Sequence, residues 1–248
     1  MNKLSQKIDL VTGGGTGIGR AIALELAKNG AEVVIVGRSE KTLQESASRH
    51  SSIHYIIADI MKSEDIASTL SEINQRFGQL DILVNNAGIA PLTPIEHVNL
   101  VDYDNTFNLN VRALIDISAQ SIPFLRESKG NIVNITSGLV NNPMPMNSIY
   151  TASKAAVLSL TRTWAKELAS HRIRVNSVAS GAVKTPLYDK LGLSAEDATN
   201  YEHAVTQVVP LGRFGEAEEI AAVVAFIASN DASYVTGAHY AVDGGFGI

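Results

Sequence analysis

The sequence TGGGTGIG, residues 12–19, comes directly after the apolar run IDLVT (8–12) and opens a helical pattern. Gly13, Gly17 and Gly19 follow the spacing G-x-x-x-G-x-G. Glycines at these positions permit a tight turn and let a pyrophosphate approach backbone amides at the start of a helix. The pattern alone also fits a flexible turn, but its place between a strand and a helix is the one that a dinucleotide-binding turn requires.

Short apolar runs rich in β-branched residues alternate with helical patterns along the whole chain. Helices are predicted to begin near Gly17, Ser39, Ser63, Asp102, Ser148 and Glu216, and strands are predicted at 8–12, 32–37, 53–59, 80–86, 131–136, 173–179 and 239–243. This alternation is typical of a parallel sheet covered on both faces. We therefore expect an α/β fold, a doubly wound parallel sheet of about seven strands, in a single domain over residues 1–248.

Composition and charge exclude several classes of protein. The formal net charge is −5 and no basic cluster appears, so we expect no nucleic-acid partner. The absence of cysteine excludes disulfides, thiolate catalysis and cysteine-bound metal. The six histidines show no ligand spacing, so we expect no metal site and an activity that survives a chelator. The longest apolar runs, such as 221–228, are too short to span a bilayer and no signal peptide is visible, so we expect a cytoplasmic protein without membrane contact.

The end of the second predicted strand bears on the choice of cofactor. Folds that prefer NAD usually place an acidic residue there, whereas a nearby arginine accommodates the 2′-phosphate of NADP. Here the strand ends at Gly37 and is followed by Arg38 and Ser39, and a guanidinium can pair bidentately with phosphate. NADP(H) is therefore the predicted cofactor, with NAD(H) as the alternative. Arg38 also fits an ordinary exposed arginine, and Ser39 fits the N-cap of the next helix.

Two polar motifs, ADI (58–60) and NNAG (85–88), close the third and fourth predicted strands. Asp and Asn at strand ends are commonly turn formers. At the carboxyl edge of a parallel sheet they also lie where ligands bind. We expect Asp59 to accept a hydrogen bond from an adenine amino group and Asn85 to support the turn.

These motifs are followed, in order, by NIVNITS (131–137), YTASK (150–154), VNSVASGAVKTP (175–186) and VDGG (242–245). In this set and order the chain resembles the short-chain dehydrogenase/reductase family over essentially its whole length, and in particular its 3-oxoacyl-acyl-carrier-protein reductase-like members. The resemblance implies a catalytic tetrad, in which an asparagine interrupts its helix and holds a water, a serine polarises the substrate carbonyl, a tyrosine is the acid/base and a lysine is its partner: Asn110, Ser137, Tyr150 and Lys154. The implied cofactor contacts come from the glycine-rich turn, the strand ends and the catalytic helix: Gly13, Gly15, Thr16, Gly17, Ile18, Gly19, Arg38, Ser39, Asp59, Ile60, Asn86, Ala87, Gly88, Tyr150, Lys154, Gly181, Val183 and Thr185.

Tyr150 and Lys154 are four residues apart, so they are neighbours on one face of a helix. A free tyrosine has a pKa of about 10, and a fixed cation one turn away favours tyrosinate. We therefore expect Lys154 to lower the pKa of Tyr150 toward neutral pH, as acid/base catalysis requires. Such a pair also occurs by chance on many helices, and Ser137 and Asn110 are what set this one apart.

The same helix is predicted to have two different faces. The face near Tyr150 carries an apolar stripe that we expect to pack on the sheet, namely Val157, Leu160, Trp164 and Leu168. The opposite face carries small residues, Ala152, Ala155, Ala156, Ser159 and Thr163, which fit either a solvent face or a subunit interface. The family resemblance favours the interface, and with it a homo-oligomer, either a tetramer or a dimer. One departure from the family is Ser180, where proline is usual; its loss makes the turn less rigid.

The residues expected to line the substrate pocket are mostly apolar and include no arginine for a carboxylate: Gly138, Leu139, Asn141, Met144, Met146, Leu187, Tyr188 and Leu191. We therefore expect an uncharged or largely apolar carbonyl or alcohol, with a 3-oxoacyl thioester as a candidate. The long connection after Thr185 contains a weak helix around 195–206 and is expected to form a substrate lid at about 186–210.

The leading hypothesis is an NADP(H)-dependent oxidoreductase that transfers a hydride between nicotinamide and a carbonyl or secondary alcohol, with Tyr150 as the acid/base. Two alternatives stay open. One is an NAD(H)-preferring alcohol dehydrogenase of the same family. The other is a non-catalytic dinucleotide-binding regulatory protein, although binding alone would not need Tyr150 or Ser137.

Overall fold

Seven parallel strands form one sheet in the computed structural model, which describes residues 3–185 and 195–248. Their spatial order is β3-β2-β1-β4-β5-β6-β7. The bounds are β1 Ile8–Thr12, β2 Glu32–Gly37, β3 Ile53–Ile57, β4 Ile82–Asn85, β5 Asn131–Ser137, β6 Arg174–Ser180 and β7 His239–Val242. The order runs outward from β1 in both directions, so the predicted doubly wound α/β fold is confirmed.

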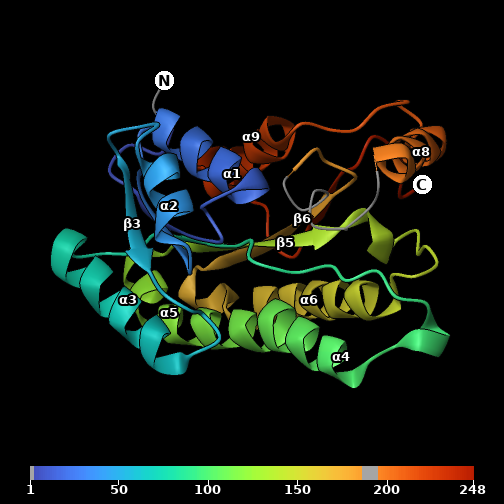
Figure 1. The fold of residues 1–248 in the computed structure, drawn as a ribbon. Coiled ribbons are helices and arrows are strands. Elements are labelled where there is room, and N and C mark those ends of the chain that lie inside the picture. The colour runs from blue at the N-terminus through green and yellow to red at the C-terminus, as the bar shows by residue number, and fades with distance from the viewer. Residues whose placement is uncertain (1–2, 186–194) are drawn as a thin grey trace.

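The helices cover both faces of this sheet. Figure 1 shows α1, α2 and α9 on one side of it and α3, α4, α5 and α6 on the other. The bounds are α1 Gly17–Lys28, α2 Glu40–Ala47, α3 Ser63–Phe77, α4 Leu100–Phe107, α5 Leu114–Ser128, α6 Ser148–Glu167, α8 Ala195–Val208 and α9 Ala217–Ala228. Between α4 and α5 lies a π-helical stretch, η2 Asn108–Ala113, and single 3-10 turns occur at Ile95–His97, Gly138–Val140, Ala169–His171 and Asn230–Ala232.

The predicted elements differ from the observed ones mainly at their ends. The third strand stops at Ile57, although the amide of Ala58 still donates to the carbonyl of Gly37 at 3.0 Å. The fourth strand begins at Ile82 and not at residue 80. The helix expected near Asp102 begins at Leu100, because the side chain of Asn99 caps the amide of Val101 at 2.9 Å.

Alternating residues of each strand pack into two separate hydrophobic cores, one on each face of the sheet. Val11 of β1 belongs to the core under α1 and α9, and Leu10 belongs to the core under α3 and α5. Asp9, between Ile8 and Leu10, is fully buried, and neither of its carboxylate oxygens has a hydrogen-bond partner among the described residues. Burial raises the pKa of Asp9 well above its ordinary value, and the charge of Asp81 raises it further.

The orientation of α6 bears out one prediction in part. Of the apolar stripe expected to face the sheet, Val157 is fully buried, and Trp164 and Leu168 are partly buried and pack against the core under α3 and α5, whereas Leu160 is partly exposed. The buried face includes Lys154, which donates to a carbonyl of β5, and Thr161, which accepts from Asn134 Nδ2 at 2.9 Å. Polar side chains therefore share the buried side of α6 with this stripe, which apolar periodicity alone did not indicate. On the small-residue face, Ala152, Ala155, Ser159 and Thr163 are exposed and Ala156 is half-buried.

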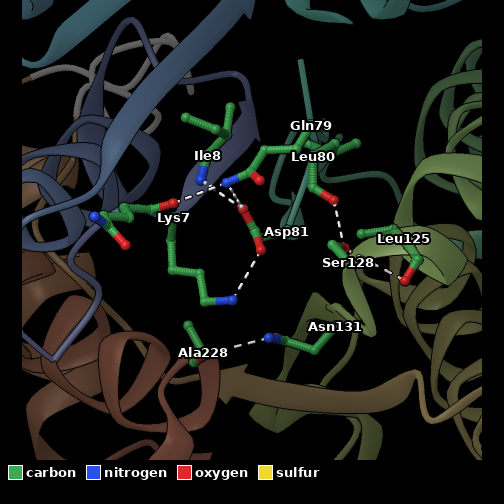
Figure 2. A network of polar contacts seen from close by, with 10 residues as sticks. Lys7, Ile8, Gln79, Leu80, Asp81, Leu125, Ser128, Asn131 and Ala228 are labelled. Atoms are coloured by element: carbon green, nitrogen blue, oxygen red, sulfur yellow. Dashed lines mark hydrogen bonds and ion pairs between the residues drawn. The ribbon is translucent and has the colours of Figure 1, made fainter. Parts of the chain in front are cut away.

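The amino edge of the sheet is closed by polar contacts (Figure 2). Asp81 accepts from Lys7 Nζ at 2.8 Å, from the backbone amide of Ile8 at 2.9 Å and from Gln79 Nε2 at 3.0 Å. Asn131 Nδ2 donates to the carbonyl of Ala228 at 3.1 Å. These bonds tie the start of β1 to β4 and the start of β5 to the end of α9.

Candidate functional site

The predicted tetrad gathers at the carboxyl edge of the sheet. Ser137 is the last residue of β5, Tyr150 and Lys154 lie in the first turns of α6, and Asn110 lies in η2. A Cβ built on Gly88 would lie 3.1 Å from Asn110 Oδ1 and 3.4 Å from Lys154 Nζ, so these two groups meet over the NNAG turn. The structure therefore brings four residues from three separate segments into one place.

Asn110 interrupts its helix, as predicted. It is fully buried in the π-helical stretch, and stretches of this kind are frequent at functional sites. Its Nδ2 donates to the carbonyl of Ile89 at 2.9 Å and to Ser153 Oγ at 3.0 Å, and its Oδ1 accepts from the amide of Ile89 at 2.9 Å. The side-chain amide is thus hydrogen-bonded to Ile89 and to Ser153. It connects the segment after the NNAG motif to α6.

Ser153 is a residue that sequence reasoning missed. Besides accepting from Asn110, its hydroxyl donates to the carbonyl of Tyr150 at 2.7 Å, and the side chain is fully buried. It therefore couples η2 to the turn that carries Tyr150 and Lys154. Its place directly before Lys154 was the only sequence signal, since its partner comes from a segment 43 residues away.

Lys154 is 4% exposed, and its Nζ donates to the carbonyl of Ile135 at 2.9 Å. Burial lowers the pKa of this lysine to about 8. The ammonium also lies over the ring of Tyr150, 5.9 Å from the ring centroid. At neutral pH the Lys154 side chain is therefore a cation that is hydrogen-bonded to a backbone carbonyl and lies beside the phenol of Tyr150.

The expectation that Lys154 lowers the pKa of Tyr150 is wrong for the described chain. Burial raises the pKa of Tyr150 above its ordinary value, and the opposing influence is a side-chain hydrogen bond to Ser137. Ser137 is itself 5% exposed and accepts from the amide of Leu139 at 3.2 Å. Desolvation outweighs this hydrogen bond, so the phenol is held in its protonated form.

The glycine-rich turn is tightly packed, which argues against the flexible alternative. Gly13 has φ +65°, and a Cβ there would lie 3.1 Å from Asn86 Nδ2 and from the Cα of Ala87. A Cβ on Gly19 would lie 2.3 Å from the carbonyl oxygen of Gly13. Gly17, with φ +51°, starts α1. These side-chain-free positions bring backbone amides to the surface at a helix start, so the turn fits a dinucleotide pyrophosphate.

Thr12 and Asn86 join this turn to NNAG. Thr12 Oγ1 accepts from the amides of Asn86 and Ala87, both at 3.0 Å, and Asn86 Nδ2 donates to the carbonyl of Thr12 at 2.9 Å. The turn-supporting role predicted for Asn85 therefore belongs to its neighbour. Asn85 points into the core, where its Nδ2 donates to Ser118 Oγ and Asn134 Oδ1 at 2.9 and 2.8 Å, because side chains alternate along the strand.

Arg38 and Ser39 are exposed at the start of α2. Ser39 is the N-cap of α2, with its Oγ 3.5 Å from the amide of Thr42, so the capping interpretation is confirmed. A Cβ on Gly37 would meet only Leu43, at 3.6 Å, which leaves open space beside Arg38. The end of β2 therefore offers open space for a phosphate and the guanidinium of Arg38, and the strand does not end in an acidic residue.

The remaining predicted contacts are placed as follows. Asp59 Oδ1 accepts from the amide of Met61 at 3.1 Å, which is a turn-forming role. Ile60 is buried in a core, and Ile18 and Ala87 are partly buried and pack against the cores. Val183 bridges to Gly215, and a Cβ on Gly181 would lie 2.5 Å from the Cα of Asp243. The hydroxyl of Ser180, the departure from the family, lies 3.5 Å from the carbonyl of Thr136 on β5.

The substrate side is only partly described. Leu139 is half-buried, while Met144 and Met146, which precede the start of α6, are 40% and 48% exposed. Leu187, Tyr188 and Leu191 lie outside the described residues, as does the lid segment up to residue 194. The helix expected around 195–206 is observed as α8.

Two properties of the described residues limit other interpretations. Among the side chains that the structure describes, no three from His, Asp or Glu gather so as to hold a metal ion. No helix in the described part of the chain combines the length and apolar character needed to cross a bilayer.

The chain is similar to known oxidoreductases over nearly its full length. The family model described as Enoyl-(Acyl carrier protein) reductase matches residues 13–247. The 3-oxoacyl-[acyl-carrier-protein] reductase FabG of Thermotoga maritima is 36% identical and is matched over 99% of this chain and 100% of its own length. A hydroxynaphthalene reductase-like protein Arp2 of Metarhizium anisopliae is 38% identical, over 98% of this chain and 95% of that protein.

Solved structures agree with these sequence matches. The 3-ketoacyl-(acyl-carrier-protein) reductase of Brucella melitensis, crystallised with NADH, superposes with a TM-score of 0.92 at 32% identity, covering 99% of this chain and 100% of that one. Levodione reductase superposes with a TM-score of 0.93 at 33% identity, covering 98% of each chain.

Proposed function

Because the chain belongs to the short-chain dehydrogenase/reductase family, we propose that it is an NADP(H)-dependent oxidoreductase acting on a carbonyl or secondary alcohol. The proposal treats residues 1–248 as one catalytic domain. The observation that carries it is the meeting of Ser137, Tyr150, Lys154 and Asn110 at the sheet edge that also carries the glycine-rich turn.

In the direction of reduction, a nicotinamide bound at this edge supplies a hydride for the carbonyl carbon. The hydroxyl of Ser137 donates a hydrogen bond to the carbonyl oxygen and polarises it. The phenol of Tyr150 gives its proton to the same oxygen as charge develops there. The raised pKa of Tyr150 suits this role, because the proton to be given is in place at neutral pH.

Lys154 and Asn110 support this proton transfer. The ammonium of Lys154 stabilises the phenolate that remains on Tyr150, and its pKa of about 8 keeps it charged at pH 7. Asn110, through Ile89 and Ser153, fixes the chain around the tyrosine. Reduction should therefore slow as pH rises through about 8, where Lys154 loses its charge.

NADP(H) is proposed over NAD(H) on the strength of the exposed Arg38 and the open space beside Gly37. The second candidate is an NAD(H)-preferring enzyme of the same family, and the NADH complex of the Brucella relative favours it. A non-catalytic binding protein is less well supported, because binding a dinucleotide gives no reason for the Tyr150–Ser137 contact.

For the substrate, we propose a 3-oxoacyl thioester or a similar largely apolar carbonyl compound. The half-buried Leu139 and the exposed Met144 offer an apolar surface beside the tetrad. The names of the Thermotoga and Brucella relatives point to the same class. The substrate contacts assigned to Leu187 and Tyr188, and the lid over them, remain predictions.

We also propose a cytoplasmic homo-oligomer. Its support is the exposed small-residue face of α6 together with exposed apolar side chains on α4, where Leu100 is 73% and Val101 59% exposed. Light scattering at micromolar concentration would give the mass in solution, and a monomer there would remove this part of the proposal.

The function is tested by incubating the protein with NADPH or NADH and a panel of ketones that includes 3-oxoacyl thioesters. We expect oxidation of NADPH with the apolar ketones. Oxidation of NADH alone would favour the second candidate, and binding without turnover on any ketone would favour the regulatory alternative.

A further inference from the structure

The carbonyl oxygen of Gly15, in the middle of the glycine-rich turn, receives hydrogen bonds from two different helices. Arg20 of α1 donates to it from Nε at 3.1 Å and from Nη2 at 2.6 Å. Ser46 of α2 donates to it from Oγ at 2.9 Å. A carbonyl oxygen has two lone pairs, so three donors fill its capacity and fix its direction.

The side chains that hold this oxygen are themselves fixed. Ser46 is 1% exposed, and its hydroxyl also accepts from Arg20 Nε at 2.8 Å. Arg20 is further restrained by Glu45, whose Oε2 lies 3.6 Å from Nη2. Together Arg20 and Ser46 form what we call the Gly15 clamp.

The clamp determines where the next backbone amide points. In a planar trans peptide the C=O and the following N–H point in opposite directions. With the Gly15 oxygen held toward Arg20 and Ser46, the N–H of Thr16 is turned away from them. Thr16 is exposed and is the N-cap of α1, and a helix start is where an anion meets unpaired amides.

The clamp also joins the turn to the helix that begins beside Arg38. A Cβ on Gly15 would lie 2.7 Å from Thr42 Oγ1, so the turn packs directly against α2. Ser46 lies one turn further along the same helix. The position of the turn is thus set by α2 as well as by α1.

We propose that Arg20 and Ser46 are positioning residues for the cofactor's pyrophosphate, acting through the Gly15 carbonyl to aim the Thr16 amide. The inference rests on the proposed function, since it needs a dinucleotide at this turn. Neither side chain touches the ligand in this account, so they set cofactor affinity and leave the chemical step alone.

The test compares two probes in Ser46→Ala and Arg20→Lys. NADPH contains the pyrophosphate, whereas 2′-AMP has the ribose phosphate but no group for the turn. We expect Ser46→Ala to weaken NADPH binding about fivefold and Arg20→Lys about tenfold, as for loss of one neutral or one charged hydrogen bond. Affinity for 2′-AMP, measured by competition, should stay within about twofold of wild type, and in steady-state assays the loss should fall on the KM for NADPH and not on kcat.

Matched controls are Ser48→Ala and Arg49→Lys, since both residues are exposed near the end of α2 and do not contact Gly15. Unchanged NADPH affinity in both clamp variants would overturn the proposal. Equal losses for NADPH and 2′-AMP would overturn it too, because they would mean a displaced α2. A wild-type protein that binds NADH but not NADPH would contradict the cofactor preference only, and the comparison would then use NADH and adenosine. A wild-type protein that binds no dinucleotide would overturn both proposals.

Discussion

At the amino edge of the sheet, Asp81 accepts three hydrogen bonds from Lys7, Ile8 and Gln79. At the carboxyl edge, the phenol of Tyr150 has a hydrogen bond to one side chain among the described residues, that of Ser137. Both groups are titratable; Asp81 directly precedes β4, and Tyr150 lies in the first turn of α6. The acid at the amino edge is fully engaged (Figure 2). The phenol at the carboxyl edge keeps capacity for another partner.

This difference separates groups that stabilise the fold from groups that are free to do chemistry. Polar side chains at the amino edge are hydrogen-bonded to the backbone and to one another. Substituting them should therefore lower the free energy of unfolding and leave the catalytic rate unchanged. At the carboxyl edge, Lys154 Nζ donates one hydrogen bond to the carbonyl of Ile135, and an ammonium group has three N–H donors, so donors remain for a ligand. In open α/β sheets, ligands bind at the carboxyl ends of the strands.

The largest expected effect is at Tyr150. Tyr150→Phe removes the proton donor but keeps the ring, so we expect kcat to fall about 10²- to 10⁴-fold. The affinity for NADPH and the melting temperature should hardly change. Tyr103→Phe is the matched control, because Tyr103 is 41% exposed on α4 and its ring packs on Phe107 of the same helix. A variant that keeps most of its turnover would remove Tyr150 from the mechanism.

The next largest effect concerns cofactor choice at the same edge. Gly37→Asp combined with Arg38→Leu places a carboxylate where the 2′-phosphate would sit and removes the guanidinium. We expect the ratio of NADPH to NADH affinity to fall about 100-fold, from charge repulsion and the lost ion pair. The added side chain fits, since its Cβ would meet only Leu43 at 3.6 Å. Gly37→Ala controls for the backbone, and tighter NADH binding by the unmodified protein would contradict the assignment.

A third prediction examines the engaged acid at the amino edge. Asp81→Asn removes the charge that Lys7 and two other donors share, so we expect the free energy of unfolding to fall by about 2 kcal/mol. The kcat of the folded variant should match that of wild type. Asp104→Asn, at an exposed position on α4, is the control. A large loss of kcat in the stable fraction would break the separation between the two edges.

The last predicted effect has the opposite sign and concerns Asp9. Its carboxylate is buried without a hydrogen-bond partner, so Asp9→Val should raise the free energy of unfolding at pH 7 by about 1–3 kcal/mol. The folded pKa of Asp9 is raised, so the native carboxyl keeps its proton while the unfolded one releases it above about 3.8. Wild-type stability is therefore lost as pH rises from that value.

The gain from Asp9→Val should accordingly be small near pH 4 and grow toward neutral pH. Urea unfolding at a series of pH values measures it. A gain that is the same at all pH values, or a loss at pH 7, would show that Asp9 has a partner or a role that the structure does not reveal.

Particular residues show what sequence alone can predict. The glycine-rich turn and the doubly wound parallel sheet follow from local patterns along the chain, and the meeting of Ser137, Tyr150 and Lys154 follows from the family resemblance. The polar part of the buried side of α6 did not, because Lys154 and Thr161 lie there through contacts with β5. The direction of the pKa shift of Tyr150 also did not, since desolvation depends on packing by segments far apart in sequence. Ser153 and the Gly15 clamp were missed for the same reason.

The central claim is that a hydride crosses to a carbonyl carbon at the carboxyl edge, and isotope transfer tests it most directly. NADPH deuterated at both C4 positions of the nicotinamide would be incubated with the protein and a 3-oxoacyl thioester, and the product analysed by mass spectrometry. The account predicts one deuterium on the carbinol carbon of the product, and no labelled product with Tyr150→Phe above about one per cent of wild type. Oxidation of NADPH that leaves the ketone unlabelled, or label transfer at the same rate in the Tyr150→Phe variant, would contradict it.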